Sequence, residues 1–380
     1  MTTTINNEHN KHNVPNLRFP EFQGEWKKTT IGDIADLYKG TGISKDQLSD
    51  DGEPCILYGE LYTKYKSETI REVISKTNID NTKLVRSKAN DVIIPCSGET
   101  AEDIATARCV LNGNILLGGD LNIIRLHGYD GAFMSYQLNG RRKYDIAKVA
   151  QGVSVVHLYG EHLKGVKTIN PCLEEQKKIA KLLSLLDERI VTQNKIIDKL
   201  QSLIKGIAQN IVRNNKPNVR LSECLESKSS TLQESDVCEQ GTYPVYGANG
   251  IVGYLDNYNT EGEAVYIIKD GSGVGTVSYV KGKCSATGTL NTLQAKEGYS
   301  LQYLYYLLKV FNFEPYKTGM AIPHIYFKDY GKAKVFCPSY TEQLQYARLL
   351  SAIDNKLSIE QNILTELTLQ KQCLLRQMFI

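Results

Sequence analysis

The sequence predicts an α+β protein in which two mixed α/β domains alternate with two long helices that pair with each other. Three observations predict this class: the second half of the chain repeats the first, two segments carry an extended heptad pattern, and the segments between them alternate strand-like runs with glycine-rich turns. The expected order is an N-terminal tail (1–20), a first domain (21–170), a central helix (171–212), a second domain (213–337, with a linker at 213–219) and a C-terminal helix (338–380).

The internal repeat has an offset of 167 residues and runs without a gap. From Gly152 to Leu200, 14 of 49 positions match the residue 167 positions later, where chance would supply roughly three. A period this long indicates a duplicated domain-plus-helix unit, because solenoid repeats run at about 20 to 50 residues. The matches include Gly152/Gly319, His157/His324, Pro171/Pro338, Gln176/Gln343, Leu183/Leu350 and Asp187/Asp354.

Both long segments carry a seam of apolar residues at heptad spacing, which favours coiled-coil helices of about 60 Å. Pro171 and Pro338 mark their N-termini, and Ser339 with Glu342 has the pattern of a capping box. In 171–212 the two seam positions hold Leu183, Ile190, Ile197, Ile204 and Ile211, and Ile179, Leu186, Gln193, Leu200 and Ile207. In 338–380 they hold Leu350, Leu357, Leu364, Lys371 and Met378, and Tyr346, Ile353, Glu360, Leu367 and Leu374.

Three polar residues interrupt these seams. Gln193 and Glu360 occupy the same slot of the two repeats, and Lys371 interrupts only the second. Buried polar seam residues fix register and partner at some cost in stability. The alternative, that they lie on a frayed or solvent-open stretch, stays open at this point.

The segments between the helices have mixed β character. Strand candidates are 91–95, 115–117 and 121–126 in the first domain, and 243–246, 251–255, 264–269, 274–280 and 290–295 in the second. Helices are expected near 132–138 and at 300–310. Residues 119–122 (GDLN) and 288–291 (GTLN) are a local echo between two segments that have otherwise diverged.

Composition describes a globular chain of 380 residues with 41% hydrophobic and 23% charged residues. The nine cysteines are scattered without a Cys-x-x-Cys pair, and the N-terminal segment MTTTINNEHNKHN is polar, so we expect a cytoplasmic protein without a signal peptide or structural zinc. The formal net charge is only +3. A chain that held DNA alone would be visibly basic, so local patches or a partner must supply the electrostatics of any DNA binding.

Several motifs occur in a specific order along the whole chain. They are VPNLRFPEFQGEW (14–26) followed by IGDIADLYKG (31–40), Pro-x-x-x-Glu-Gln at 171–176 and again at 338–343, YPVYGANGIVGY (243–254) and KQCLLRQMFI (371–380). Together they resemble the specificity subunit of a type I restriction-modification system.

This resemblance implies a pseudo-two-fold arrangement in which each α/β unit is a target recognition domain for one half of a bipartite, asymmetric DNA site. It also implies that the helices pack as an antiparallel coiled coil, set the half-site spacing and bind two modification (methyltransferase) subunits, with restriction (motor-nuclease) subunits joining through the complex. S-adenosylmethionine, ATP and magnesium are then expected in the partner subunits, and no cofactor or metal in this chain.

Polar residues on turns are the candidates for base reading, since Arg and Lys suit guanine, Asn suits adenine and Lys holds phosphates. In the first domain they are Lys39, Thr41, Tyr58, Glu60, Ser97, Arg108 and Asn122. In the second they are Tyr246, Asn249, Lys269, Ser272, Thr289, Asn291 and Lys317. The acidic clusters at 50–53 and 99–103 could accept from a cytosine amino group, but solvated loops explain them better.

Catalytic patterns are missing from the sequence. The stretch 271–275 (GSGVG) lacks the spacing of a nucleotide-binding loop and lies between two strand candidates. His157 and His324 lack neighbouring metal ligands in the sequence and are interpreted as a duplicated structural junction between domain and helix. We therefore expect a non-catalytic DNA-recognition subunit; the alternative is a coiled-coil scaffold or adaptor that does not read DNA.

Overall fold

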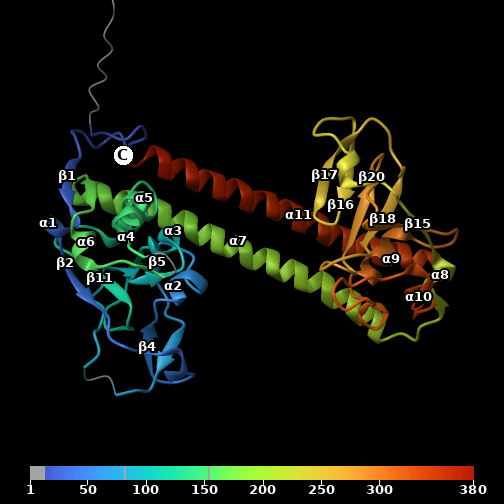
Figure 1. Cartoon of the computed structure of the whole chain (residues 1–380), viewed down its shortest axis with the longest axis horizontal. Helices are drawn as coiled ribbons and strands as arrows, with labels where there is room; N and C mark the ends of the chain where they lie inside the picture. The colour runs from blue at the N-terminus through green and yellow to red at the C-terminus, as the bar shows by residue number, and fades with distance from the viewer. Residues whose placement is uncertain (1–12, 81–82, 153–154) are drawn as a thin grey trace, which may run out of the picture. The chain divides into compact units, whose positions relative to one another are not determined.

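The computed structural model describes residues 13–80, 83–152 and 155–380, and the chain divides into two compact units. The first unit comprises residues 1–193 and 364–380, and the second comprises residues 194–363. Each unit holds one mixed α/β domain and a segment of each long helix (Figure 1). Residues 1–12 of the predicted tail lie outside the described residues.

The first domain is built on a sheet with the strand order β2-β11-β7-β9-β5. Its strands are β2 (Ala35–Lys39), β5 (Thr69–Ile70), β7 (Asp91–Pro95), β9 (Arg108–Val110) and β11 (Leu121–Leu126). A second sheet, of order β10-β4-β6-β3, contains β3 (Leu48–Ser49), β4 (Glu53–Ile56), β6 (Ser75–Thr77) and β10 (Leu116–Leu117). Short pairs join β1 (Lys27–Thr30) to β13 (Lys167–Asn170), and β8 (Ser97–Gly98) to β12 (Val156–His157). The helices are α1 (Ile31–Ile34), α2 (Glu60–Thr63), α3 (Ala101–Ile104), α4 (Gly131–Asn139), α5 (Lys143–Val149) and α6 (Gly160–Lys164).

Strand β7 shows why this sequence forms the middle of a sheet. All five of its residues are buried, and successive side chains of a strand point to opposite faces. Val92 and Ile94 pack in the cluster that contains Phe133 of α4, whereas Ile93 packs in a separate cluster with Ile123 of β11. An uninterrupted apolar run therefore serves two cores at once.

The second domain repeats this plan with a sheet of order β15-β21-β18-β19. Its strands are β15 (Leu225–Ser229), β18 (Glu263–Ile268), β19 (Val277–Lys281) and β21 (Leu290–Ala295). A smaller sheet, β17-β16-β20, contains β16 (Tyr243–Gly247), β17 (Gly250–Leu255) and β20 (Ser285–Ala286), and β14 (Val219–Arg220) pairs with β22 (Lys334–Val335). The helices are α8 (Leu221–Cys224), α9 (Leu301–Leu308) and α10 (Phe327–Tyr330).

The duplication thus extends to four strands of the main sheet of each domain. In both sheets a central strand, β11 or β21, runs antiparallel to the strands on either side. The helix that follows is capped in both copies, by Asp130 accepting from the Phe133 amide (2.8 Å) and by Ser300 accepting from the Tyr303 amide (3.4 Å). Similar backbones therefore carry sequences that have diverged.

The long helices are α7 (Leu173–Arg213) and α11 (Tyr340–Gln377), and each begins two residues after its proline. The predicted capping box of α11 is confirmed: the Ser339 amide donates to Glu342 Oε2 (3.2 Å), and the Glu342 amide donates to Ser339 Oγ (3.4 Å). Within the described residues, no helix combines the length and apolar character needed to cross a membrane.

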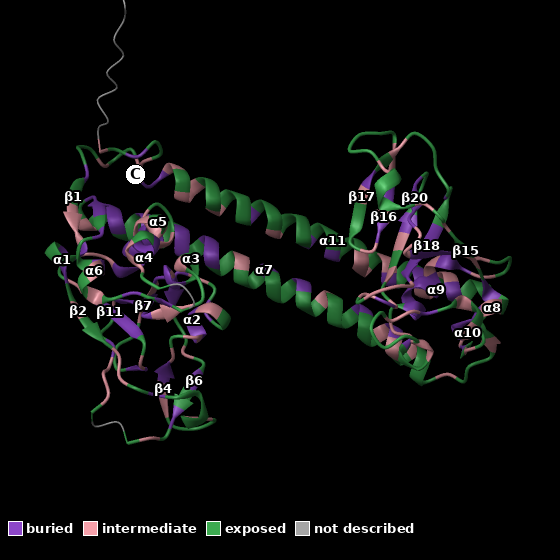
Figure 2. Ribbon diagram, in the orientation of Figure 1, coloured by how far each residue is buried: buried purple, intermediate pink, exposed green. Residues whose placement is uncertain are grey.

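The predicted seam positions of both helices are buried or half-buried (Figure 2). Buried positions are Ile179, Leu183, Leu186, Ile197, Ile204, Leu350, Leu357, Leu367 and Met378, and half-buried ones are Ile190, Leu200, Ile207, Ile211, Tyr346, Ile353, Leu364, Lys371 and Leu374. Gln193 and Glu360 are also buried. The solvent-open interpretation is therefore wrong for these two breaks.

Within each unit the helix segments run antiparallel. In the first unit Lys371 contacts Asp187, and just after the end of α11 Met378 joins the core that contains Ile179. In the second unit one cavity is lined by Gln201, Ile204, Asp354, Leu357 and Gln361, and a second brings Ala208 and Ile211 beside Leu350. The predicted fold class, with two mixed α/β domains alternating with paired antiparallel helices, is confirmed.

Most of the expected strands occur where the sequence places them. Those at 91–95, 121–126 and 290–295 have the observed bounds, whereas the strand expected at 274–280 begins only at Val277. The reason is a turn before it, where Gly271 and Gly275 both adopt a positive φ that L-residues disfavour. Ser300 caps α9 instead of beginning it.

Candidate nucleic-acid interface

Polar loops of the second domain gather at one end of its sheet. Antiparallel neighbours bring together the C-terminal ends of β15 and β18 and the N-terminal end of β21: Ser229 lies opposite Asn291, and Ile268 opposite Leu290. Backbone bonds fasten the loops beyond them, as in Lys269 N to Thr289 O (3.0 Å). Since Thr287 N donates to Tyr246 O (2.9 Å), the β16–β17 turn belongs to the same edge.

The candidates of the second domain lie on or near this edge but differ in exposure. Asn249 and Ser272 are exposed, and Asn291 is buried. Tyr246, Lys269, Thr289 and Lys317 are half-buried. Lys317 forms an ion pair with Glu314 (2.6 Å). The edge therefore offers hydroxyl, amide and ammonium groups to a ligand.

The first domain has the same edge at the equivalent strand ends. Gly40 N donates to Leu121 O (2.9 Å), and Thr41 N donates to Leu117 O (3.1 Å). Cys96 N donates to Asp120 O (2.7 Å), which matches the Lys269–Thr289 bond of the second domain. Of the candidates, Lys39 and Tyr58 are exposed, Thr41 and Ser97 are half-buried, and these residues all belong to or adjoin this edge.

Three other candidates are held inside the protein. Glu60 is 6% exposed and accepts from the Leu57 amide (3.0 Å) and from Lys64 Nζ (2.7 Å), and Ser75 also donates to it. Asn122 donates to the Leu158 carbonyl (2.9 Å), and Asn291 bonds Ser229 Oγ (2.9 Å). Buried, bonded groups cannot reach a base without rearrangement, so these side chains are not available for contact with DNA.

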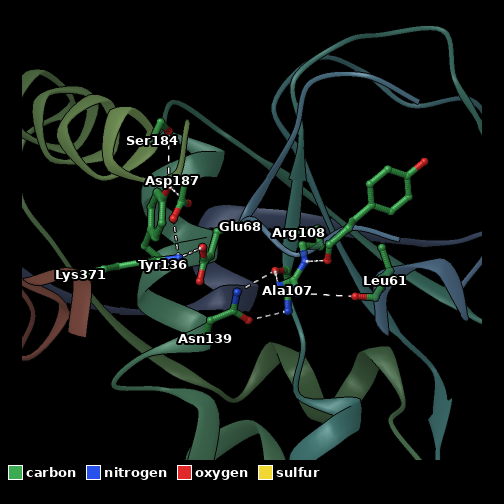
Figure 3. A network of polar contacts seen from close by, with 10 residues as sticks. Leu61, Glu68, Ala107, Arg108, Tyr136, Asn139, Ser184, Asp187 and Lys371 are labelled. Carbon is green, nitrogen blue, oxygen red and sulfur yellow. Dashed lines mark hydrogen bonds and ion pairs between the residues drawn. The ribbon is translucent and has the colours of Figure 1, made fainter. Parts of the chain in front are cut away.

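Arg108 is also engaged by the protein. It donates to the carbonyls of Tyr65 (3.0 Å) and Ala107 (2.9 Å), and burial lowers the pKa of its guanidinium. Its role is to satisfy these backbone groups (Figure 3). The acidic clusters are likewise bonded locally, with Asp103 in a cap with Thr100 (Oγ1 to Oδ2, 2.7 Å) and Glu53 paired with Arg86.

The repeated histidines occupy matching hairpins. His157 exchanges backbone bonds with Gln151 (2.9 and 2.7 Å), and His324 does so with Thr318 (2.9 and 2.7 Å). Each hairpin is fastened to the sheet edge, by Leu158 N to Cys96 O (2.8 Å) and by Ile325 N to Lys269 O (2.9 Å). The duplicated element is thus a hairpin on the polar edge, before α6 or α10, and not the junction with the helix that was expected.

The repeated Pro-x-x-x-Glu-Gln motif has a clear structural role. Gln176 Nε2 donates to the Pro171 carbonyl (2.8 Å), while its Oε1 accepts from the Asp130 amide (2.9 Å). Gln343 makes the same pair of bonds with Pro338 (2.9 Å) and Ser300 (2.9 Å). Each glutamine thereby ties the start of a long helix to the start of α4 or α9.

A network of polar contacts joins the helices to the first domain (Figure 3). Tyr136 of α4 donates to Asp187 of α7 (2.7 Å), and Lys371 of α11 bonds both Asp187 and Glu68 (2.6 Å each). The sequence indicated Asp187 by its repeat and Lys371 by its break of the seam, but gave no sign of Tyr136 or Glu68. No group of His, Cys, Asp and Glu residues that could hold a metal is found in 13–80, 83–152 and 155–380.

Comparison with known proteins identifies a family whose model matches both repeats of the chain. A family model described as "Type I restriction modification DNA specificity domain" matches residues 23–202 and again 214–369. The MjaVIII type I restriction enzyme specificity subunit of Methanocaldococcus jannaschii is 28% identical over 205 residues, which are 54% of this chain and 45% of that protein. A Mycoplasma genitalium protein named as a type I specificity subunit is 24% identical, with 93% of this chain and 94% of the relative covered.

Solved structures support the fold. The crystal structure of a type I restriction-modification S subunit from M. genitalium superposes with a TM-score of 0.71 at 20% identity, covering 97% of this chain and 99% of that one. A chain from a structure on complex assembly of the type I R-M system gives 0.51 at 15% identity, covering 93% and 97%. At these identities the likeness concerns the arrangement of the chain.

Proposed function

Because this chain belongs to the type I restriction-modification DNA specificity family, we propose that it is the subunit that selects the DNA sequence in such a complex. Each domain reads one half of a bipartite, asymmetric site through its polar sheet edge. The paired helices set the spacing between the half-sites. The chain itself performs no catalytic step.

The observation that carries this proposal is that equivalent positions of two matching edges hold different side chains. Cys96 N and Lys269 N make the same backbone bond, and each carbonyl accepts from the neighbouring hairpin, yet the Cys96 side chain is buried whereas the Lys269 side chain is half-buried. The residues bonded to them, Asp120 and Thr289, also differ. A repeated frame with exchanged polar groups is what two unlike half-sites require, because bases are distinguished by donor and acceptor pattern.

Partner subunits complete this proposal. Each long helix exposes several large apolar side chains along its length: Leu182, Leu185 and Leu203 in α7, and Leu349, Ile359 and Leu369 in α11. We assign this surface to two modification (methyltransferase) subunits, with restriction subunits joining through them. S-adenosylmethionine, ATP and magnesium would belong to those subunits, whose basic groups would also compensate for a net charge of only +3 here.

Exchange of residues 27–150 for the corresponding segment of another family member tests the proposal. Methylome sequencing of cells that express the exchanged chain with its modification partner should show one half of the motif changed and the other retained. Exchange of the second domain is the matched control and should change only the other half. A recognised motif that stays unchanged in both exchanges would refute the proposal. Equal affinity of the complex for specific and scrambled duplexes over a range of salt concentrations would favour the adaptor alternative.

A further inference from the structure

We propose that Lys371 selects the helix that pairs with the first repeat: it admits the C-terminal helix of the same chain and rejects the central helix of a second copy. The two helices are repeats of one another with matching seams, so α7 could in principle pair with α7 of another chain. At one seam position the first repeat has Ile204 and the second has Lys371. Lys371 forms an ion pair with the buried carboxylate of Asp187.

The position of Lys371 is defined by three elements of the first unit. Its Nζ lies 2.6 Å from Asp187 Oδ1 on α7 and 2.6 Å from Glu68 Oε2, just before β5. Its side chain also lies over the ring of Tyr136 on α4, with 5.7 Å from Nζ to the centroid. Figure 3 shows both carboxylates directed at this one ammonium.

Both carboxylates are largely out of water, with side chains 6% (Asp187) and 11% (Glu68) exposed. Burial raises the pKa of Asp187, the charge of Glu68 raises it further, and Lys371 opposes both effects. Burial acts to lower the pKa of Lys371, but Glu68 and Asp187 outweigh it and the pKa is raised. Two buried carboxylates can both stay ionised only with a cation close by, and without one the site must take up a proton or bear their repulsion.

The equivalent of Lys371 in α7 is Ile204, 167 positions earlier. If the α7 of a second copy occupied the place of α11, Ile204 would lie against Asp187 and Glu68. Two buried carboxylates would then face each other across an aliphatic side chain, with Tyr136 donating to Asp187 and the more distant Arg108 guanidinium, which makes no hydrogen bond to either carboxylate, as the remaining cation. Removal of one partner from a buried ion pair is strongly destabilising, so this pairing is disfavoured.

The second unit shows how an uncharged version of this contact is built. There Ile204 is 4% exposed and lines a cavity with Asp354, the repeat of Asp187. Tyr306 donates to Asp354 (3.2 Å), as Tyr136 does to Asp187. Asp354 is half-buried, unlike Asp187, so an isoleucine is tolerated opposite it. The restriction on the partner therefore resides in the first repeat.

Thermal unfolding of the full-length chain tests the charge requirement. Lys371→Ile places in the native pair the side chain that a second copy would bring, and it should lower the Tm by about 10 °C. In a Glu68→Gln/Asp187→Asn background the same substitution should cost less than half of that shift. Lys164→Met, which breaks an exposed pair with Glu161, is the control and should leave the Tm within about 1 °C. Equal losses in both backgrounds would overturn the proposal.

Pairing between copies is measured by co-expressing two full-length chains with different affinity tags. Both sets of chains carry Phe379→Val. Phe379 packs on Phe133 (5.1 Å between ring centroids) and favours pairing with the C-terminal helix for a reason unrelated to charge, whereas the equivalent residue after the central helix seam is Val212. Chains that also carry Glu68→Gln, Asp187→Asn and Lys371→Ile should form mixed-tag complexes at least threefold more often than chains with Phe379→Val alone. An unchanged mixed fraction at comparable Tm would overturn the proposal.

Discussion

The two units use one frame but hold their helices differently. Both attach the long helix through a glutamine and direct a tyrosine at an aspartate of α7 or α11. The first unit adds an ammonium between two carboxylates and inserts Met378 and Phe379 of the chain end into its core. The second fills the position equivalent to Lys371 with Ile204.

This difference shows which parts of a duplication are free to change. The glutamine bonds satisfy backbone groups that exist in any copy of the frame, so they recur with nearly identical lengths. The charges around Asp187 depend on a particular neighbour and are found in one unit. The glutamine contacts to the backbone and the tyrosine–aspartate bond recur in both copies, and the ion pairs of Lys371 distinguish the first.

The largest effects are expected from the two glutamines. Gln176→Leu leaves the Asp130 amide and the Pro171 carbonyl without partners, and should lower the free energy of unfolding by about 2–4 kcal/mol. Gln343→Leu should cost the same within about 1 kcal/mol, because its bonds are the same. Denaturant unfolding with probes in each domain measures both. A cost confined to one unit would show that the frames are not energetically equivalent.

The tyrosines should separate the units. Tyr136 is fully buried and bonds a buried carboxylate at 2.7 Å, so Tyr136→Phe should cost about 2 kcal/mol. Tyr306 bonds a half-buried one at 3.2 Å, so Tyr306→Phe should cost about 1 kcal/mol or less. Chemical denaturation of the two full-length variants checks the order, and a reversed order would contradict the role assigned to burial.

The hydrophobic pattern of the sequence predicted those helices and strands whose pattern positions are consistently shielded from water. The run 91–95 and the seams of α7 and α11 are mainly apolar because their positions are buried or half-buried, so their bounds or registers follow from the sequence. The elements within 27–80 were not predicted. They are short strands and single-turn helices whose positions depend on contacts with distant segments, such as β1 with β13.

The candidate interface was predicted less well than the fold. Turn residues such as Lys39, Asn249 and Ser272 are exposed as expected, because loops lie at the surface. Glu60 and Asn122 satisfy neighbouring groups of their own domain instead. Sequence alone cannot distinguish a polar residue directed outward from one directed inward at the same turn, since both have the same local pattern.

The two exposed or half-exposed lysines of the edges offer a comparison in DNA binding. Lys39→Ala and Lys269→Ala should each weaken binding by the assembled complex by about 1 kcal/mol and reduce the salt slope by about one, if they hold phosphates. Titration of specific duplexes between about 50 and 200 mM salt measures this. Lys164→Met, away from the edges, is the control. A loss for only one duplex sequence would instead indicate base contact.

The smallest effect concerns pH and Asp187. Because burial and Glu68 raise its pKa above the ordinary 3.8, the folded chain binds this proton more tightly than the unfolded chain. The associated stability is fully present below pH 3.8 and is lost as pH rises through the folded pKa. The Asp187→Asn side chain does not titrate. As the pH rises from 3.8 through the folded pKa of Asp187, the free energy of unfolding of wild type should therefore fall relative to that of the variant, by roughly 1 kcal/mol for each pH unit between the folded and unfolded pKa values. Lys371, Glu68, Tyr136 and the charge of Arg108 surround position 187 in both proteins. Parallel pH profiles of wild type and variant would therefore contradict a raised pKa for Asp187.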